Sequence, residues 1–187
     1  MKRVLLIILL HLSLFFLVFA YQAQASEEEW KIDRYESLVF ARVYGEVIHG
    51  DSLNFFINSK ENCEKVWHNF TFYTYEQPRD IKQLLNKNIP IKINDEEVTA
   101  HVDHIQPFLM GYRVLLSLGS FPIKEYIYKL NNFYIEEKRF EIEIIDGIDF
   151  KASKYFDIRN NSWKLDKLVP SVLEANKLCK EIFDKKL

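Results

Sequence analysis

The sequence has little glycine, proline or cysteine: five Gly, five Pro and two Cys among 187 residues. This scarcity excludes collagen-like and low-complexity chains, and it leaves little room for a glycine-rich loop that cradles phosphate. Charge of one sign is also lacking, because 25 Lys and Arg stand against 27 Asp and Glu. A mild, mixed charge does not favour nucleic acid or an anionic membrane surface as a partner.

Only one long apolar run occurs, at residues 4–20, directly after Lys2 and Arg3. It is followed by Ala23-Gln24-Ala25, and the three parts together are typical of a secretory signal peptide. The alternative is an uncleaved anchor, although 17 residues lie at the short end for spanning a bilayer. We expect cleavage after Ala25, a mature chain with no membrane span, and a periplasmic or secreted location in a bacterium.

The two cysteines, Cys63 and Cys179, both follow the expected leader. In an oxidising compartment two cysteines most simply pair, and the bridge would close a loop of 116 residue steps (179 − 63). The alternative, a pair of free or metal-binding thiols, lacks the close spacing of zinc ligands. The sequence therefore predicts a structural disulfide between an early element and the C-terminal one.

Aromatic residues are abundant, with 15 Phe, 10 Tyr and 3 Trp, and together with the many Ile residues they favour strands. Turn signals separate eight expected strands, at 38–48, 52–57, 66–75, 89–93, 98–105, 112–118, 139–145 and 148–155. Asp146-Gly147 lies between the last two, which predicts a hairpin. The segment 123–130, after Pro122, fits a short helix or a strand.

The C-terminal segment has a different period. Its apolar residues recur at steps of three and four, namely Leu165, Leu168, Val172, Ala175, Cys179 and Ile182. This pattern predicts an amphipathic helix over about 169–184. We therefore expect one mainly β (minor α+β) domain over 26–187. It would be an antiparallel β-sandwich or small barrel of about seven to nine strands, with the helix packed on it.

One compact group of possible metal ligands occurs, His101-Val102-Asp103-His104. On a strand His101 and Asp103 share a face and His104 points away, so a site would need further ligands such as His49 and Asp51. This group would suit a small secreted metal-dependent hydrolase. The alternative interpretation is a solvated strand face.

Aromatic side chains give a second candidate site. Trp67, Tyr73 and Tyr75 alternate on one face of an expected strand, and Tyr44 lies on a neighbouring one. Such residues concentrate at binding surfaces, where they would line a groove for an apolar ligand, a glycan or a protein segment. They also fill β-sandwich cores, which is the alternative.

No catalytic residue or cofactor is predicted, because the chain has no G-x-S-x-G elbow and no phosphate-binding loop. The leading hypothesis is an exported, non-enzymatic binding or accessory protein. It would present a sheet face, edge or loop to a protein partner or an envelope ligand. The alternatives are the metal-dependent hydrolase and an inhibitor or immunity-type protein that plugs an envelope-active hydrolase with a loop at 58–62 or 107–111.

Overall fold

The computed structural model describes residues 29–46 and 51–185, so the expected leader at 1–25 and His49 lie outside the described residues. Nine strands form one antiparallel sheet in the order β1-β2-β3-β4-β7-β6-β5-β8-β9. The strands are β1 (Lys31–Tyr35), β2 (Leu38–Tyr44), β3 (Ser52–Asn58), β4 (Lys65–Thr74), β5 (Asn88–Ile93), β6 (Glu96–Phe108), β7 (Gly111–Pro122), β8 (Arg139–Ile144) and β9 (Asn160–Lys164).

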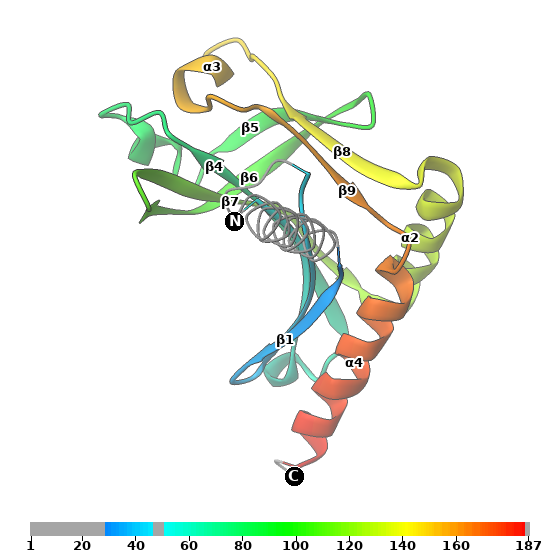
Figure 1. Cartoon of the computed structure of the whole chain (residues 1–187). Coiled ribbons are helices and arrows are strands. Elements are labelled where there is room, and N and C mark those ends of the chain that lie inside the picture. Colours follow the sequence, from blue (N-terminus) through cyan, green and yellow to red (C-terminus); the bar gives the residue numbers. More distant parts are fainter. Residues whose placement is uncertain (1–28, 47–50, 186–187) are drawn as a thin grey trace, which may run out of the picture.

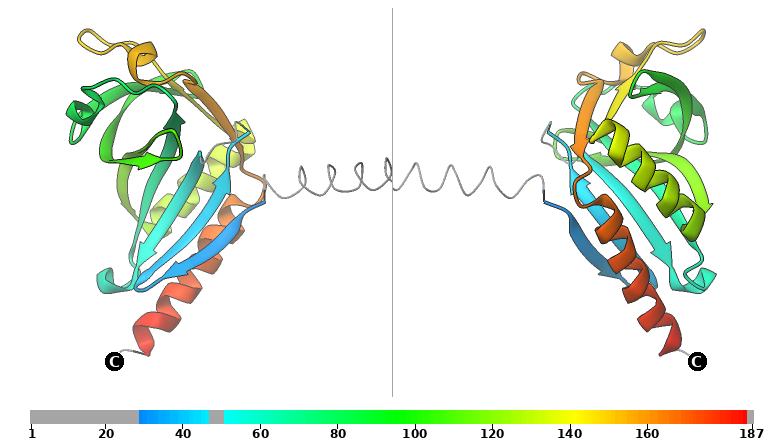
Figure 2. Two further views of the ribbon diagram at one scale, coloured as in Figure 1. Left: turned by 60° about the vertical axis from the view of Figure 1, so that its left-hand side comes forward. Right: turned by 90° about the vertical axis from the view of Figure 1, so that its right-hand side faces the viewer.

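The sheet curls into a half-barrel; the two long helices lie along its open side, and the short helix lies apart from them at the other end (Figures 1 and 2). The helices are α2 (Ile123–Glu137), α3 (Ala152–Tyr155) and α4 (Leu168–Asp184), with 3-10 turns at Ser59–Glu61 and Ile81–Leu84. Alternate residues of each strand face the inside, as Val39, Ala41 and Val43 do on β2, and these three are fully buried. The expected mainly β, antiparallel architecture with a C-terminal helix is confirmed.

The helix α4 covers the inner face of β1, β2 and β3 and also contacts α2. Its apolar stripe is buried, including Val172, Ala175 and Cys179 with no exposed surface. These residues join the strands in one continuous hydrophobic core. The helical period of the sequence therefore predicted both the helix and its buried side, with bounds within one residue of 169–184.

The segment 123–130, for which the sequence allowed either a helix or a strand, is part of the helix α2. This helix begins directly after Pro122. Tyr126 fastens it to the core, because the Tyr126 hydroxyl lies 2.5 Å from Nδ1 of His68 on β4. His68 also stacks on Phe55, with ring centroids 4.4 Å apart. Burial lowers the pKa of His68 to about 3, so its ring is neutral and acts as a core side chain.

The Asp146-Gly147 hairpin prediction is wrong. β8 ends at Ile144 and pairs with β9, which begins only at Asn160, after the helix α3. Asp146 Oδ1 instead accepts a hydrogen bond from the backbone N–H of Ala152 at 2.9 Å, at the start of α3. An Asp side chain that bonds nearby backbone competes with a strand ladder, which explains why the dipeptide opens a longer loop.

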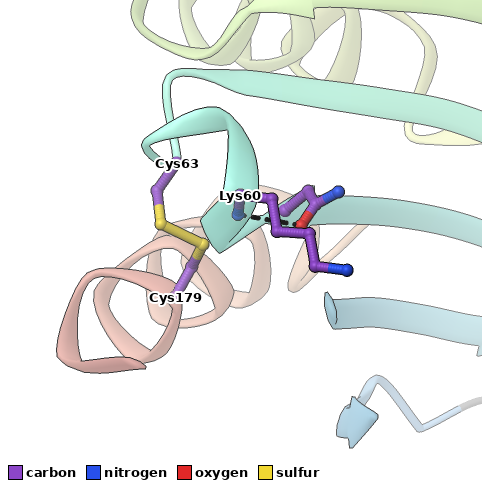
Figure 3. The surroundings of a disulfide bond; sticks show 4 residues. Lys60, Cys63 and Cys179 are labelled. Atoms are coloured by element: carbon purple, nitrogen blue, oxygen red, sulfur yellow. Dashed lines mark hydrogen bonds between the residues drawn. A yellow bond between two sulfur atoms is a disulfide. The ribbon is translucent and has the colours of Figure 1, made fainter. Parts of the chain in front are cut away.

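The disulfide joins Cys63, directly after the first 3-10 turn, to Cys179 on α4, with Cα atoms 5.9 Å apart (Figure 3). Both cysteines are buried. The pairing agrees with the expectation from the sequence. In the same turn the backbone N–H of Lys60 donates to Asn58 Oδ1 at 3.0 Å, which fixes the loop that presents Cys63. The bridge therefore ties α4 to the β3–β4 connection.

The strand β9 also contacts β2. The backbone N–H of Glu46 donates to the carbonyl of Ser162 at 3.1 Å. Beside it, Asp51 accepts hydrogen bonds from the Tyr73 backbone N–H at 2.6 Å and from Asn161 Nδ2 at 2.8 Å. Asp51 is only 3% exposed, and this burial raises its pKa from 3.8 to about 7 against the opposing effect of the two hydrogen bonds.

Within residues 29–46 and 51–185, no helix is both long enough and apolar enough to cross a membrane.

Replacing both cysteines by alanine should lower the free energy of unfolding by roughly 4–5 kcal/mol, because a closed loop of this length restricts the unfolded chain. Urea unfolding of the oxidised protein and of C63A/C179A measures the change. Reduced wild-type protein is the control and should unfold at the midpoint of the variant. Equal midpoints for the oxidised protein and the variant would contradict a stabilising role for the bridge.

Removing the Asp51 carboxylate should change how stability depends on pH. Between pH 4 and 7 folded Asp51 holds a proton that the unfolded chain has released, so its contribution falls as pH rises. D51N cannot ionise, so the stability of D51N relative to wild type should increase over this range. The expected change is on the order of 4 kcal/mol, since each pKa unit is worth about 1.4 kcal/mol.

Denaturant unfolding at pH 4 to 8 measures this difference. D95N, in the exposed turn between β5 and β6, is the matched control for the loss of one carboxylate. Stability curves of D51N and wild type that run parallel over the whole range would contradict the assignment.

Candidate ligand-binding site

The outer face of the central strands is hollowed into a trough of about 640 Å³. Strand pairing places its side chains in rows that run across the sheet. The lining residues are Asp33, Arg34, Tyr35, Phe40, Arg42, Ser52, Asn54, Phe56, Asn69, Thr71, His104, Gln106, Arg113 and Leu115. We call this hollow the outer trough.

Aromatic rings form the first row. Phe40, Phe56 and Trp67 are direct neighbours across β2, β3 and β4. The ring centroids of Phe40 and Phe56 lie 5.5 Å apart, and those of Phe56 and Trp67 lie 5.7 Å apart with their planes only 3° from parallel. Phe40 and Phe56 border one end of the outer trough with flat apolar surface.

Short polar side chains form the floor. The Ser52 and Thr71 hydroxyls are 3.0 Å apart, and Asn54 Nδ2 donates to Ser52 Oγ at 3.0 Å. Asn69 lies opposite Asn54 in the register and is 6% exposed. The carboxamide of Asn69, which carries both a donor and an acceptor, also lines the outer trough.

Positive charge exceeds negative charge along the lining. Three arginines are present, against Asp33 as the single acid among the described lining residues. Asp33 Oδ2 pairs with Arg42 Nε at 2.5 Å. Arg113 has no ion pair among residues 29–46 and 51–185, and its buried Nε lacks a hydrogen-bond partner there. Its guanidinium is held 3.6 Å above the ring of Phe108, and desolvation lowers its pKa from the ordinary value.

The four aromatic residues predicted from the sequence do not form one groove. Trp67 stands at the end of the aromatic row and stacks on Phe56. Tyr44 lies next to Arg42, whose guanidinium carbon is 5.6 Å from the centre of the Tyr44 ring. Tyr73 is buried at the far end, edge-on to Tyr75 with centroids 4.8 Å apart. Phe40 and Phe56, which line the outer trough, were not among the predicted residues.

The predicted metal ligands among the described residues do not gather at one point. His101 Nδ1 lies 2.9 Å from Asn88 Oδ1, and its Nε2 is 3.9 Å from the Asp103 carboxylate. Asp51 is buried at the start of β3, three strands away from β6. In the part of the chain that the structure describes, no three His, Cys, Asp or Glu side chains are placed to hold a metal ion.

His104 does not point away from His101 as strand alternation would require. The register shifts between Val102 and His104, so that Val102 pairs with Leu116 and His104 with Leu115. One extra residue, Asp103, occupies this bulge and resets the alternation. The bulge places His104 in the lining of the outer trough.

The connection between β6 and β7 forms an apolar tip beyond the outer trough. Leu109 and Met110 are each 73% exposed. The tip is held down, because Gln77 Nε2 donates to the Met110 carbonyl and a Cβ on Gly111 would lie 2.0 Å from the Thr74 carbonyl oxygen. Only glycine allows this close approach at position 111.

Comparisons of the chain with protein-family models, curated proteins and solved structures found no match. The function of this protein therefore has to be argued from its own residues.

Proposed function

We propose that the protein is exported to an oxidising compartment and acts there as a non-enzymatic binding protein that holds a polar ligand in the outer trough. The single observation that supports this most strongly is Arg113, which lines the outer trough without an ion pair among residues 29–46 and 51–185 and whose buried Nε lacks a hydrogen-bond partner there. A buried polar atom without a partner is costly, and a bound ligand would supply the missing bond.

The chemistry of the lining favours binding over catalysis. General acid–base chemistry uses paired titratable groups that flank a reacting bond. Asp33 is the only acid among the described lining residues, and its carboxylate is already committed to Arg42. Amides, hydroxyls and flat rings are instead the groups that orient a ligand in a binding site.

Nuclear magnetic resonance tests this proposal with a panel of neutral and acidic sugars, amino acids and nucleosides. At least one probe class should shift the backbone signals of the trough rows and the side-chain NH₂ signal of Asn69. L115W should abolish these shifts, because a large ring on the floor fills the hollow. L173W, on the exposed side of α4, is the matched control and should keep them.

Shifts that gather elsewhere on the molecule would contradict the proposal. So would shifts that persist unchanged in L115W, or the absence of shifts with every probe class.

The tip at Leu109 and Met110 supports a second candidate, an inhibitor that plugs the cleft of a hydrolase. Two adjacent large apolar side chains at one projecting turn offer contiguous apolar surface, which can mark a contact site for a partner. These two do so on a fixed turn, since Phe108 packs edge-on against Tyr73 with centroids 5.9 Å apart. A rigid convex apolar point suits insertion into a concave site.

Inhibition assays against muramidases, amidases and serine proteases test the second candidate. One class should be inhibited at a 1:1 ratio, and L109S/M110S should weaken inhibition by at least about tenfold, since central apolar anchors dominate interfaces. I148S, which removes an exposed apolar side chain away from the tip, is the control. Unchanged inhibition by the double variant, or no inhibition of any class, would contradict this candidate.

A further inference from the structure

We infer that the ligand of the outer trough is a carboxylate-bearing oligosaccharide, with its carboxylate bound by Arg113 and its sugar rings laid along the floor toward Phe56. This inference rests on the proposed function and assigns the ligand class of the same site.

The charge of the outer trough points to an acidic ligand. Three arginines and one aspartate give the lining a formal charge of +2, in a chain whose formal net charge is −2. Arg42 already has the Asp33 carboxylate, whereas Arg113 has no counter-charge among the described ion pairs. The planar guanidinium binds a carboxylate through two parallel hydrogen bonds.

Arg113 is positioned before any ligand arrives. Its guanidinium lies on the Phe108 ring, and Gln106 is its direct partner across β6 and β7. A side chain already held in place loses less rotamer entropy when it binds. Among the described residues, the acid whose charge acts on Arg113 is the buried Asp51, and burial raises the pKa of Asp51 to about 7.

The spacing of the rows requires an extended ligand. Arg113 lies opposite Tyr73 in the register, four residues along β4 from Asn69 and six from Trp67. At about 3.3 Å per residue these separations are roughly 13 and 20 Å. A single small anion at Arg113 cannot also reach Asn69 or the aromatic row, whereas an oligomer can.

The strands under the trough favour a saccharide over a peptide. β3, β4 and β7 are interior strands whose two edges are already paired. An extended peptide therefore finds no free backbone edge for strand addition on these floor strands, and the edge strand β1 lies only at the border of the outer trough. The floor instead offers amides and hydroxyls that both donate and accept hydrogen bonds, which matches sugar hydroxyls. The rings of Phe40 and Phe56 offer flat surfaces for the apolar faces of sugars.

Titration calorimetry tests the inference with uronate tetramers of three kinds: galacturonate, mannuronate and hyaluronan. Each is compared with its carboxyl-reduced neutral form. At least one acidic tetramer should bind about tenfold or more tightly than its neutral form, and the preference should shrink from 50 to 300 mM salt as charges are screened.

Two variants test the role of Arg113. R113Q should reduce the affinity for the acidic tetramer to that of the neutral form. Q106E should have the same effect while keeping Arg113, because it places a carboxylate beside the guanidinium. R79Q, at an exposed position outside the lining, is the matched control and should bind as wild type does. Circular dichroism and thermal melting establish that each variant is folded.

Equal binding of acidic and neutral forms, or a preference that survives in both R113Q and Q106E, would overturn the inference. If no tetramer binds but another probe class shifts the trough signals in an L115W-sensitive way, the ligand class is wrong and the proposed function stands. If no probe of any kind affects the outer trough, both fail.

Discussion

The packing of α4 against the inner face of β1–β3 is the interaction on which the rest of the structure depends. A single curled sheet buries only its inner face, and without α4 the apolar residues of β1–β3 on that face would be exposed. The disulfide at Cys179 holds the helix to the β3–β4 connection. Because the inner face of these strands already packs against α4, their outer face does not have to be buried. It can therefore carry polar side chains.

The outer trough is a consequence of this division between faces. Along β3 and β4, polar residues of the outer face alternate with core residues such as Leu53 and Phe70. The polar residues that form the floor are Ser52, Asn54, Asn69 and Thr71. Short side chains on the floor and larger ones at the border make the hollow. The proposed site is therefore built on paired strands instead of loops, which would favour a fixed geometry for a bound ligand.

Much of the fold could be predicted from local signals, because helical period and strand alternation are properties of the chain itself. α4, its buried Cys179 and most strand positions follow from these periods. The site could not be predicted to the same degree. The alternation of residues along each strand places Phe40 and Phe56 on the outer face. Their alignment with Trp67 in one row depends on the register between strands, which the sequence does not show. The bulge at Asp103 and the capping role of Asp146 likewise arise from tertiary context.

The position of the bridge relative to the β6–β7 tip has a consequence for proteolysis. Cys63 precedes the tip and Cys179 follows it, so a protease that cuts between Leu109 and Met110 leaves one half-cystine on each fragment. The two fragments stay covalently joined, and the strands on either side of the cut keep their pairing with β4 and β5. Cleavage at this exposed turn therefore does not release either part of the molecule.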